Sequence, residues 1–180
     1  MPNKIETIIC FLACAKNGII WSSCSPDFGA QGVVDRFKQI EPKVFITCDY
    51  YYYNGKKINI LDKVEKILKQ IPSIKKVIAF NYNKQERESL KNFINFEKTL
   101  KHDLDEVFER FEFNHPIYIL FSSGTTGKPK CITHGSGNVL IEHNKEFMLH
   151  CDIRENEKLF YYTTTGWMMW NWLVGGLATG

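Results

Sequence analysis

The sequence predicts an α/β fold in which a parallel sheet is flanked by helices. Short apolar runs of strand length alternate along the chain with segments whose apolar residues recur at helical spacing. This alternation is typical of units in which a helix connects two parallel strands. The chain of 180 residues contains no internal repeat and no low-complexity linker, so a single domain is the simplest organisation.

The first 48 residues contain two predicted helices and two predicted strands. The first helix ends at Gly18 and has apolar residues at helical spacing, namely Ile5, Ile8, Ile9, Leu12 and Ala13. A buried strand over residues 19–22 follows it. The second helix covers residues 33–40 and stops near Pro42, and residues 44–48 form the second strand.

A turn is predicted next, because Asn54-Gly55 is among the strongest signals for a β-hairpin. The third helix covers residues 60–71, presents lysines on its outer face and ends before Pro72. The third strand covers residues 77–82. Together these elements extend the alternation of strands and helices.

The second half of the chain begins with a polar, weakly periodic stretch, residues 83–115, which predicts long loops and a peripheral helix or two. The elements predicted after it are a strand at 117–122, a returning strand at 130–134, a helix at 137–150, a strand at 160–163 and a largely buried helix at 167–178.

The connection between the strands at 117–122 and 130–134 has the composition of a polyphosphate-binding loop. It reads Ser122-Ser123-Gly124-Thr125-Thr126-Gly127-Lys128-Pro129-Lys130. Glycines let backbone N–H groups approach phosphate oxygens, hydroxyls donate hydrogen bonds and can reach Mg²⁺, and lysines neutralise charge. The alternative is an ordinary Ser/Gly turn.

The spacing within this loop excludes two better-known nucleotide motifs. Only two residues separate Gly124 from Gly127, where a Walker A loop needs four, and a proline follows Lys128. The dinucleotide pattern G-x-G-x-x-G is not present.

The composition excludes other classes of partner. The net charge is +3 and the lysines are dispersed, so nothing in the sequence predicts a nucleic-acid partner. The apolar run from Trp167 to Gly180 is too short to span a bilayer. A signal-like N-terminus is interrupted by Glu6. The six cysteines contain no C-x-x-C pair, which favours buried, reduced thiols and a cytoplasmic location over disulfides.

The loop resembles the phosphate-binding signature of the AMP-forming acyl-adenylating enzymes, in which Gly-Thr-Thr-Gly-x-Pro-Lys follows an apolar strand. Further segments resemble the acetoacetyl-CoA synthetase branch of this superfamily. They are residues 20–29, residues 35–37, His134 and residues 166–172. The resemblance implies ATP-dependent ligation of acetoacetate to CoA through an acyl-adenylate, with Mg²⁺ as cofactor and small molecules as partners.

The resemblance also assigns roles to residues. It implies that the ATP phosphates are bound by Ser122, Ser123, Gly124, Thr125, Thr126, Gly127, Lys128 and Lys130. One of Thr125 and Thr126 would assist Mg²⁺. The family usually has glycine after the second lysine, where this chain has Cys131.

Three further sites are weighed against structural alternatives. Trp167, Met168 and Met169 would line the acyl pocket, although a Trp/Met cluster is often core. Lys56 would contact the CoA phosphate; the alternative is that it is a solvated lysine in a turn. His134 would contact substrate or phosphate; the alternative is that it is a structural histidine.

The resemblance implies that residues 1–180 are a partial AMP-binding N-terminal domain from which the C-terminal domain is absent. The catalytic lysine would lie outside the chain, so no catalytic residue is assigned and the chain alone is expected to be inactive. Two alternatives stay open. One is a non-catalytic truncated remnant, and the other is a ligase for another short acid such as acetate or propionate.

Overall fold

The computed structural model describes residues 1–83, 93–100, 107–123 and 127–179. They form two compact units. The first unit consists mainly of Pro26–Glu106, together with Ser123–Pro129. The second consists of Asn3–Ser25, Val107–Ser122 and Lys130–Gly180.

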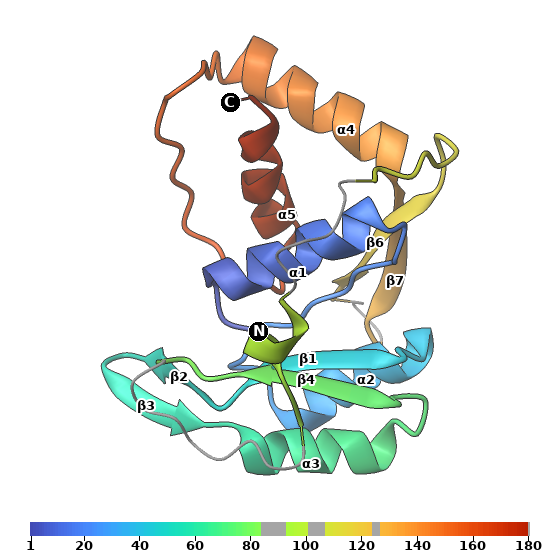
Figure 1. Ribbon diagram of the computed structural model, residues 1–180, viewed down its shortest axis with the longest axis vertical. Coiled ribbons are helices and arrows are strands. Elements are labelled where there is room, and N and C mark those ends of the chain that lie inside the picture. Colours follow the sequence, from blue (N-terminus) through green and yellow to red (C-terminus); the bar gives the residue numbers. More distant parts are fainter. Residues whose placement is uncertain (84–92, 101–106, 124–126, 180) are drawn as a thin grey trace. The chain divides into compact units, whose positions relative to one another are not determined.

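The first unit contains the predicted parallel sheet with flanking helices (Figure 1). Its strands, in spatial order, are β1 (Val44–Cys48), β4 (Lys76–Phe80) and β5 (Ile94–Asn95), all parallel. The helices α2 (Ala30–Ile40) and α3 (Leu61–Gln70) lie along one face. The short 3-10 helix η1 (Phe96–Thr99) follows β5.

Periodic apolar residues explain why these helices form and where they pack. In α3, Val64 and Ile67 are buried while the lysine-rich side faces outward. In α2, Phe37 is buried and its ring packs edge-on against Phe45 of β1, with the ring centroids 6.1 Å apart, a separation typical of aromatic pairs. The α/β prediction is therefore confirmed for this part of the chain.

The predicted hairpin is also present. It consists of β2 (Tyr50–Tyr53) and β3 (Lys56–Asn59), which pair antiparallel. Asn54 and Gly55 both have positive φ angles, 47° and 73°. Two successive left-handed residues are what the tightest hairpin turn requires, and Asn-Gly adopts them at little cost.

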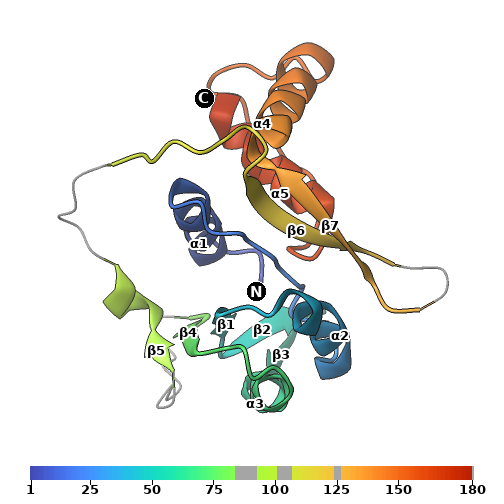
Figure 2. The same ribbon diagram turned by 90° about the vertical axis from the view of Figure 1, so that its right-hand side faces the viewer.

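The second unit is built on an antiparallel strand pair (Figure 2). The two strands are β6 (Pro116–Ser122) and β7 (Lys130–Gly135). The helical elements of this unit are α1 (Ile5–Lys16), α4 (Ser136–Lys145), the π-helical turn η2 (Glu146–His150), α5 (Met168–Gly175) and the 3-10 turn η3 (Gly176–Thr179). The predicted helix at 137–150 is thus confirmed, with a change of winding near its end.

Aromatic contacts form the core of the second unit. Phe11 of α1 lies with its ring 6.0 Å from that of Trp21, 6.2 Å from that of Tyr118 and 5.8 Å from that of Trp170. The buried face of α1 therefore contains Phe11 and Cys10. The apolar stripe that predicted this helix is largely exposed, because α1 is apolar on several sides and the aromatic contacts decide which side is covered. Its exposed members are Ile5, Ile9 and Leu12.

Two predicted strands are wrong. Residues 19–22 contain only an isolated parallel bridge, between Trp21 and Tyr118. Directly after Trp21, a side chain makes the hydrogen bond to β6, because the Ser22 hydroxyl donates to Ile119 O at 2.8 Å. Residues 160–163 form no strand, and Phe160 and Tyr162 are more than four-fifths exposed.

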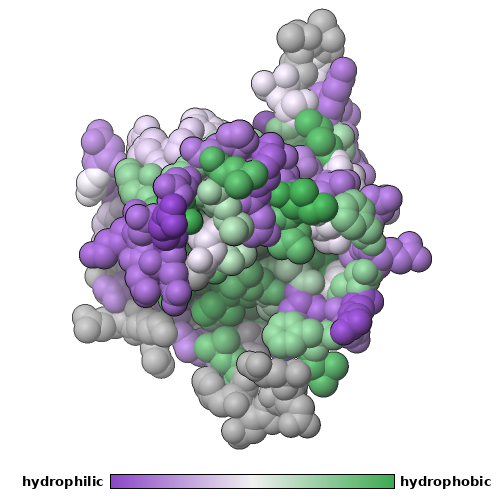
Figure 3. All heavy atoms as spheres, turned by 90° about the horizontal axis from the view of Figure 1, so that it is seen from above, coloured by the Kyte–Doolittle hydropathy of each residue, from purple (hydrophilic) through white to green (hydrophobic). Residues whose placement is uncertain are grey.

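The surface of the described residues mixes apolar and polar side chains, as Figure 3 shows for one face. Four of the six cysteines are buried or half-buried, but Cys131 and Cys151 are exposed, which corrects the prediction that all are buried. None of the six cysteines is in a disulfide. Among the described residues, no helix is long and apolar enough to cross a membrane.

We expect Gly18→Ala to lower the free energy of unfolding by about 2–4 kcal/mol, measured by urea denaturation. Gly18 has φ +62°, and an added Cβ would lie 2.4 Å from Cε1 of Phe111. Gly32→Ala is the control, because its nearest neighbouring atom would be 3.7 Å away, on Arg36. Its expected effect is stabilising, since alanine is the better helix former. Equal effects of the two substitutions would contradict this account.

Candidate functional site

The described ends of the glycine-rich loop are held by the β6–β7 pair. Ser122, the last residue of β6, lies opposite Lys130, the first residue of β7. Ser123 and Lys128 are exposed. Gly127 has φ +145°, a conformation that residues with a side chain rarely adopt. Three of the predicted phosphate-binding residues, Gly124, Thr125 and Thr126, lie outside the described residues.

The returning end of the loop is bonded to helix α2. The Gln39 amide Nε2 donates to Pro129 O at 2.9 Å and to Asp35 O at 2.7 Å. This contact orients the peptide between the two lysines of the loop. The sequence did not predict it, because a glutamine on an exposed helix face has no distinctive pattern.

The predicted acyl-pocket residues stand at the start of α5. Trp167 is 55% exposed and Met168 is 48% exposed, while Met169 is half-buried. The core position of this segment is instead Trp170, which is fully buried and donates from Nε1 to Asn3 Oδ1 at 2.9 Å. The expectation of a largely buried helix at 167–178 is therefore wrong for its first turn and for its end, where Leu177 is 64% exposed. Trp167 and Met168 are therefore not part of the core.

Two buried side chains fix the residues that precede this segment. The Ser23 hydroxyl donates to Thr165 O, and the Thr165 hydroxyl donates to Cys24 O at 3.4 Å. Thr165 is 1% exposed. The bend into Gly166 and Trp167 is thus held by hydroxyl-to-carbonyl bonds, which sequence spacing alone did not reveal.

His134 lies on β7, next to Tyr118 of β6 in the strand register. Their ring centroids are 4.9 Å apart. Burial lowers the pKa of His134 from its usual 6.5. Burial likewise lowers the pKa of His143 in α4, an effect that His134 reinforces and Glu142 opposes. Both imidazoles are therefore neutral in the folded protein near pH 7.

We expect the free energy of unfolding to fall as the pH is lowered from 7 to 5. The unfolded chain takes up these protons near pH 6.5, whereas the folded chain takes them up only at lower pH. The stabilising difference is thus complete above the unfolded pKa and is lost below it. Urea denaturation at several pH values measures this slope. His134→Gln and His143→Gln should flatten it, whereas exposed His150→Gln should not; an unchanged slope in both would contradict the assignment.

Lys56 is exposed on the hairpin of the first unit, opposite Tyr53 in the strand register. Its neighbour Lys57 points to the other face, where its Nζ lies 3.9 Å from the ring centroid of Tyr50. Because side chains alternate between the two faces of a strand, the two lysines lie on opposite faces of the hairpin. Lys57 contacts an aromatic ring, and Lys56 shares its face of the hairpin with Tyr53.

The chain matches the family model described as AMP-binding enzyme over residues 1–180. The chain belongs to the AMP-binding enzyme family. It is 50% identical over 186 residues to an acetoacetyl-coenzyme A synthetase of Rhizobium meliloti. It is 46% identical over 189 residues to an acetoacetyl-CoA synthetase of Gallus gallus. Each alignment covers 100% of this chain and 28% of the relative.

Part of a solved structure has the same fold as this chain. Acetoacetyl-CoA synthetase from Streptomyces lividans matches with a TM-score of 0.95 at 42% sequence identity. The match covers 100% of this chain and 28% of that one. The α/β architecture predicted from the sequence is confirmed by this likeness, and the chain spans about a quarter of the length of the family members it matches.

Proposed function

We propose that this chain supplies the phosphate-binding and acyl-recognition parts of an AMP-forming ligase that joins acetoacetate to CoA. The reaction class is that of an acid–thiol ligase, which first forms an acyl-adenylate from ATP and then transfers the acyl group to the CoA thiol. The observation that carries the proposal is the Ser122–Lys130 loop, whose described ends are held by paired strands and by Gln39. The names of the relatives at 42–50% identity support the choice of acid.

The loop residues would stabilise the charge that develops on the departing pyrophosphate. Backbone N–H groups from Ser123 to Gly127 and the hydroxyls of Thr125 and Thr126 are the donors, and Lys128 and Lys130 balance the charge. Among the described residues, no cluster of three acidic, histidine or cysteine side chains could hold a metal ion. The hydroxyl oxygens of Thr125 and Thr126 are of the ligand type that Mg²⁺ prefers. Bound Mg²⁺ would neutralise phosphate charge.

The remaining proposed contacts concern the other two substrates, the acid and CoA. Trp167, Met168 and Met169 would contact the short apolar end of the acid. Lys56 would pair with the CoA phosphate, and His134 is proposed to line the substrate or phosphate side of β7. The substrates are then ATP, CoA and a short oxo acid. The six cysteines, none of which is in a disulfide, support a cytoplasmic location.

The proposal is tested by pyrophosphate exchange with acetoacetate, acetate, propionate and butyrate. Because the chain spans 28% of the relatives, we compare the chain itself with a chimeric enzyme. In this chimera, the 180 residues replace the matching stretch of the Rhizobium meliloti relative. We expect acetoacetate-dependent exchange in the chimera and background exchange in the chain alone. A folded chimera that activates acetate or propionate in preference to acetoacetate would refute the choice of acid.

A further inference from the structure

The carboxylate of Asp49 is the buried polar centre of the first unit. Asp49 follows β1 directly and is 0% exposed. Its Oδ1 accepts hydrogen bonds from the backbone N–H groups of Tyr50 and Tyr82, each at 2.8 Å. Its Oδ2 accepts a bond from Asn81 Nδ2 at 2.9 Å. A carboxylate can be buried at tolerable cost only when donors surround it in this way.

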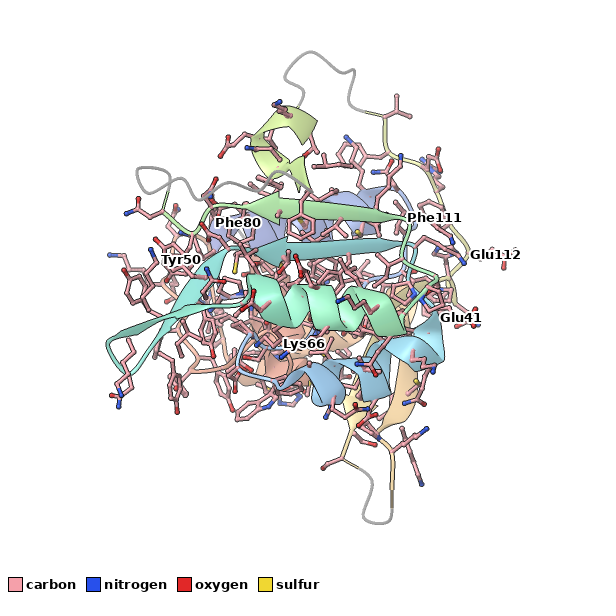
Figure 4. The ribbon with its side chains drawn as sticks, turned by 90° about the horizontal axis from the view of Figure 1, so that it is seen from below. Glu41, Tyr50, Lys66, Phe80, Phe111 and Glu112 are labelled. Atoms are coloured by element: carbon pink, nitrogen blue, oxygen red, sulfur yellow. The ribbon has the colours of Figure 1, made fainter. Side chains whose placement is uncertain are left out.

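The main chain of Asp49 makes two further bonds. Its N–H donates to Phe80 O at 3.3 Å, and its C=O accepts from the N–H of Ile60 at 3.0 Å. Figure 4 shows Tyr50 and Phe80 at the same end of the sheet, where β1 and β4 finish. Asp49 thus links the ends of four strands by hydrogen bonds or by direct succession in the chain. These are the last residues of β1 and β4, the start of β2, and the residue that follows β3.

The hairpin needs such an anchor. An isolated two-stranded hairpin is marginally stable in water, so its orientation depends on how its base is fixed. The Tyr50 and Tyr82 rings, 5.3 Å apart, also hold the base. Packing between rings tolerates small rotations of the hairpin, whereas the three hydrogen bonds to one carboxylate fix the direction in which the hairpin leaves the sheet.

We propose that Asp49 is a positioning residue that sets the direction of the β2–β3 hairpin and thereby the place of Lys56. This inference rests on the proposed role of Lys56 at the CoA phosphate. Lys56 lies opposite Tyr53, which is four residues beyond Asp49 and thus roughly 13 Å away along an extended strand. A rotation of about 10° at the base would displace the tip by about 2 Å, and displacements near 1 Å already impair binding geometry strongly.

The test compares the two half-reactions in the chimeric enzyme. We expect Asp49→Ala to raise the KM for CoA about 10-fold and to change acetoacetate-dependent pyrophosphate exchange less than about 2-fold. Asp49→Asn should recover most of this loss. Its amide oxygen can still accept from Tyr50 and Tyr82, and the Asn81 amide can turn to accept from the new NH₂ group. Asp62→Asn, an exposed Asp-to-Asn change on α3, is the matched control and should leave both half-reactions unaltered.

The outcomes separate this inference from the function on which it rests. If Lys56→Ala raises the KM for CoA but Asp49→Ala does not, Asp49 has no positioning role and the CoA site stands. If Lys56→Ala has no effect on that KM, the CoA assignment itself fails. Parallel losses in both half-reactions for Asp49→Ala would identify a purely structural residue.

Two further measurements apply if Asp49→Ala does not fold. Asn81→Ala removes the bond to Asp49 Oδ2 while leaving the carboxylate in place, and it should raise the KM for CoA about 2- to 4-fold with exchange unaltered. Hydrogen exchange on the 180-residue chain should show faster exchange of the Tyr51–Ile58 hairpin amides in Asn81→Ala, with α3 unchanged. Uniformly faster exchange across the unit, or no change in the hairpin, would overturn the inference.

Discussion

The double substitution Thr125→Ala/Thr126→Ala is expected to slow acetoacetate-dependent pyrophosphate exchange in the chimeric enzyme by about 10²- to 10⁴-fold. Each threonine hydroxyl would donate to a phosphate oxygen whose charge increases as pyrophosphate departs. A donor that is more strongly bonded in the transition state than in the ground state acts on turnover. The KM for acetoacetate should therefore change by less than about 3-fold.

The control for this prediction is Thr133→Ala on β7. Thr133 is exposed and lies opposite Ile119 in the strand register, away from the end where the loop begins. The Thr133→Ala substitution removes the same hydroxyl and methyl groups as each loop substitution and leaves the loop unchanged. An unaltered exchange rate in the double variant would remove the phosphate role from both threonines. A large rise in the KM for acetoacetate at constant turnover would assign them to acid binding instead.

Elements fixed by local chemistry were predicted well from the sequence. The Asn54-Gly55 turn has both left-handed residues that its dipeptide predicts, and β1 has the bounds expected from its apolar run. In α3 the periodic positions Val64 and Ile67 are buried. In these cases the residue pattern and the tertiary environment favour the same conformation, so local reasoning is sufficient.

Elements that depend on contacts between distant residues were not predicted. Residues 160–163 have the aromatic and β-branched composition of a strand, yet no neighbouring strand pairs with them in the described parts of the chain. The buried side of α1 was missed because the contacts of Phe11 come from positions 10 to 159 residues later in the sequence. Side-chain packing then overrides the apolar pattern.

The candidate site shows the same division. The glycines, hydroxyls and lysines of the loop are recognisable from composition, because their chemistry is local. The residues that hold the loop and the hairpin in place are not recognisable in this way. Gln39 bonds to Pro129, 90 residues later, and Asp49 bonds to Tyr82, 33 residues later. A single glutamine or aspartate carries no sequence signal of such a partner, so these residues emerge only from the structure.

Met168→Ala is expected to lower kcat/KM for acetoacetate in the chimeric enzyme by about 10- to 100-fold. Met168 would cover the methyl end of the acid, and shortening it leaves that end in contact with water. The space so created should accommodate longer 3-oxo acids. The ratio of kcat/KM for 3-oxohexanoate to that for acetoacetate should therefore rise.

The exposure of Met168 makes this prediction separable from a loss of stability. Because its side chain is 48% exposed, its truncation should change the free energy of unfolding by less than about 1 kcal/mol. Trp170→Ala, by contrast, should cost about 3–5 kcal/mol, since that ring is fully buried. Met148→Ala, at a methionine 59% exposed on η2, is the matched control. Equal activity losses in Met148→Ala and Met168→Ala, or an unchanged acid preference in Met168→Ala, would show that Met168 does not contact the acid.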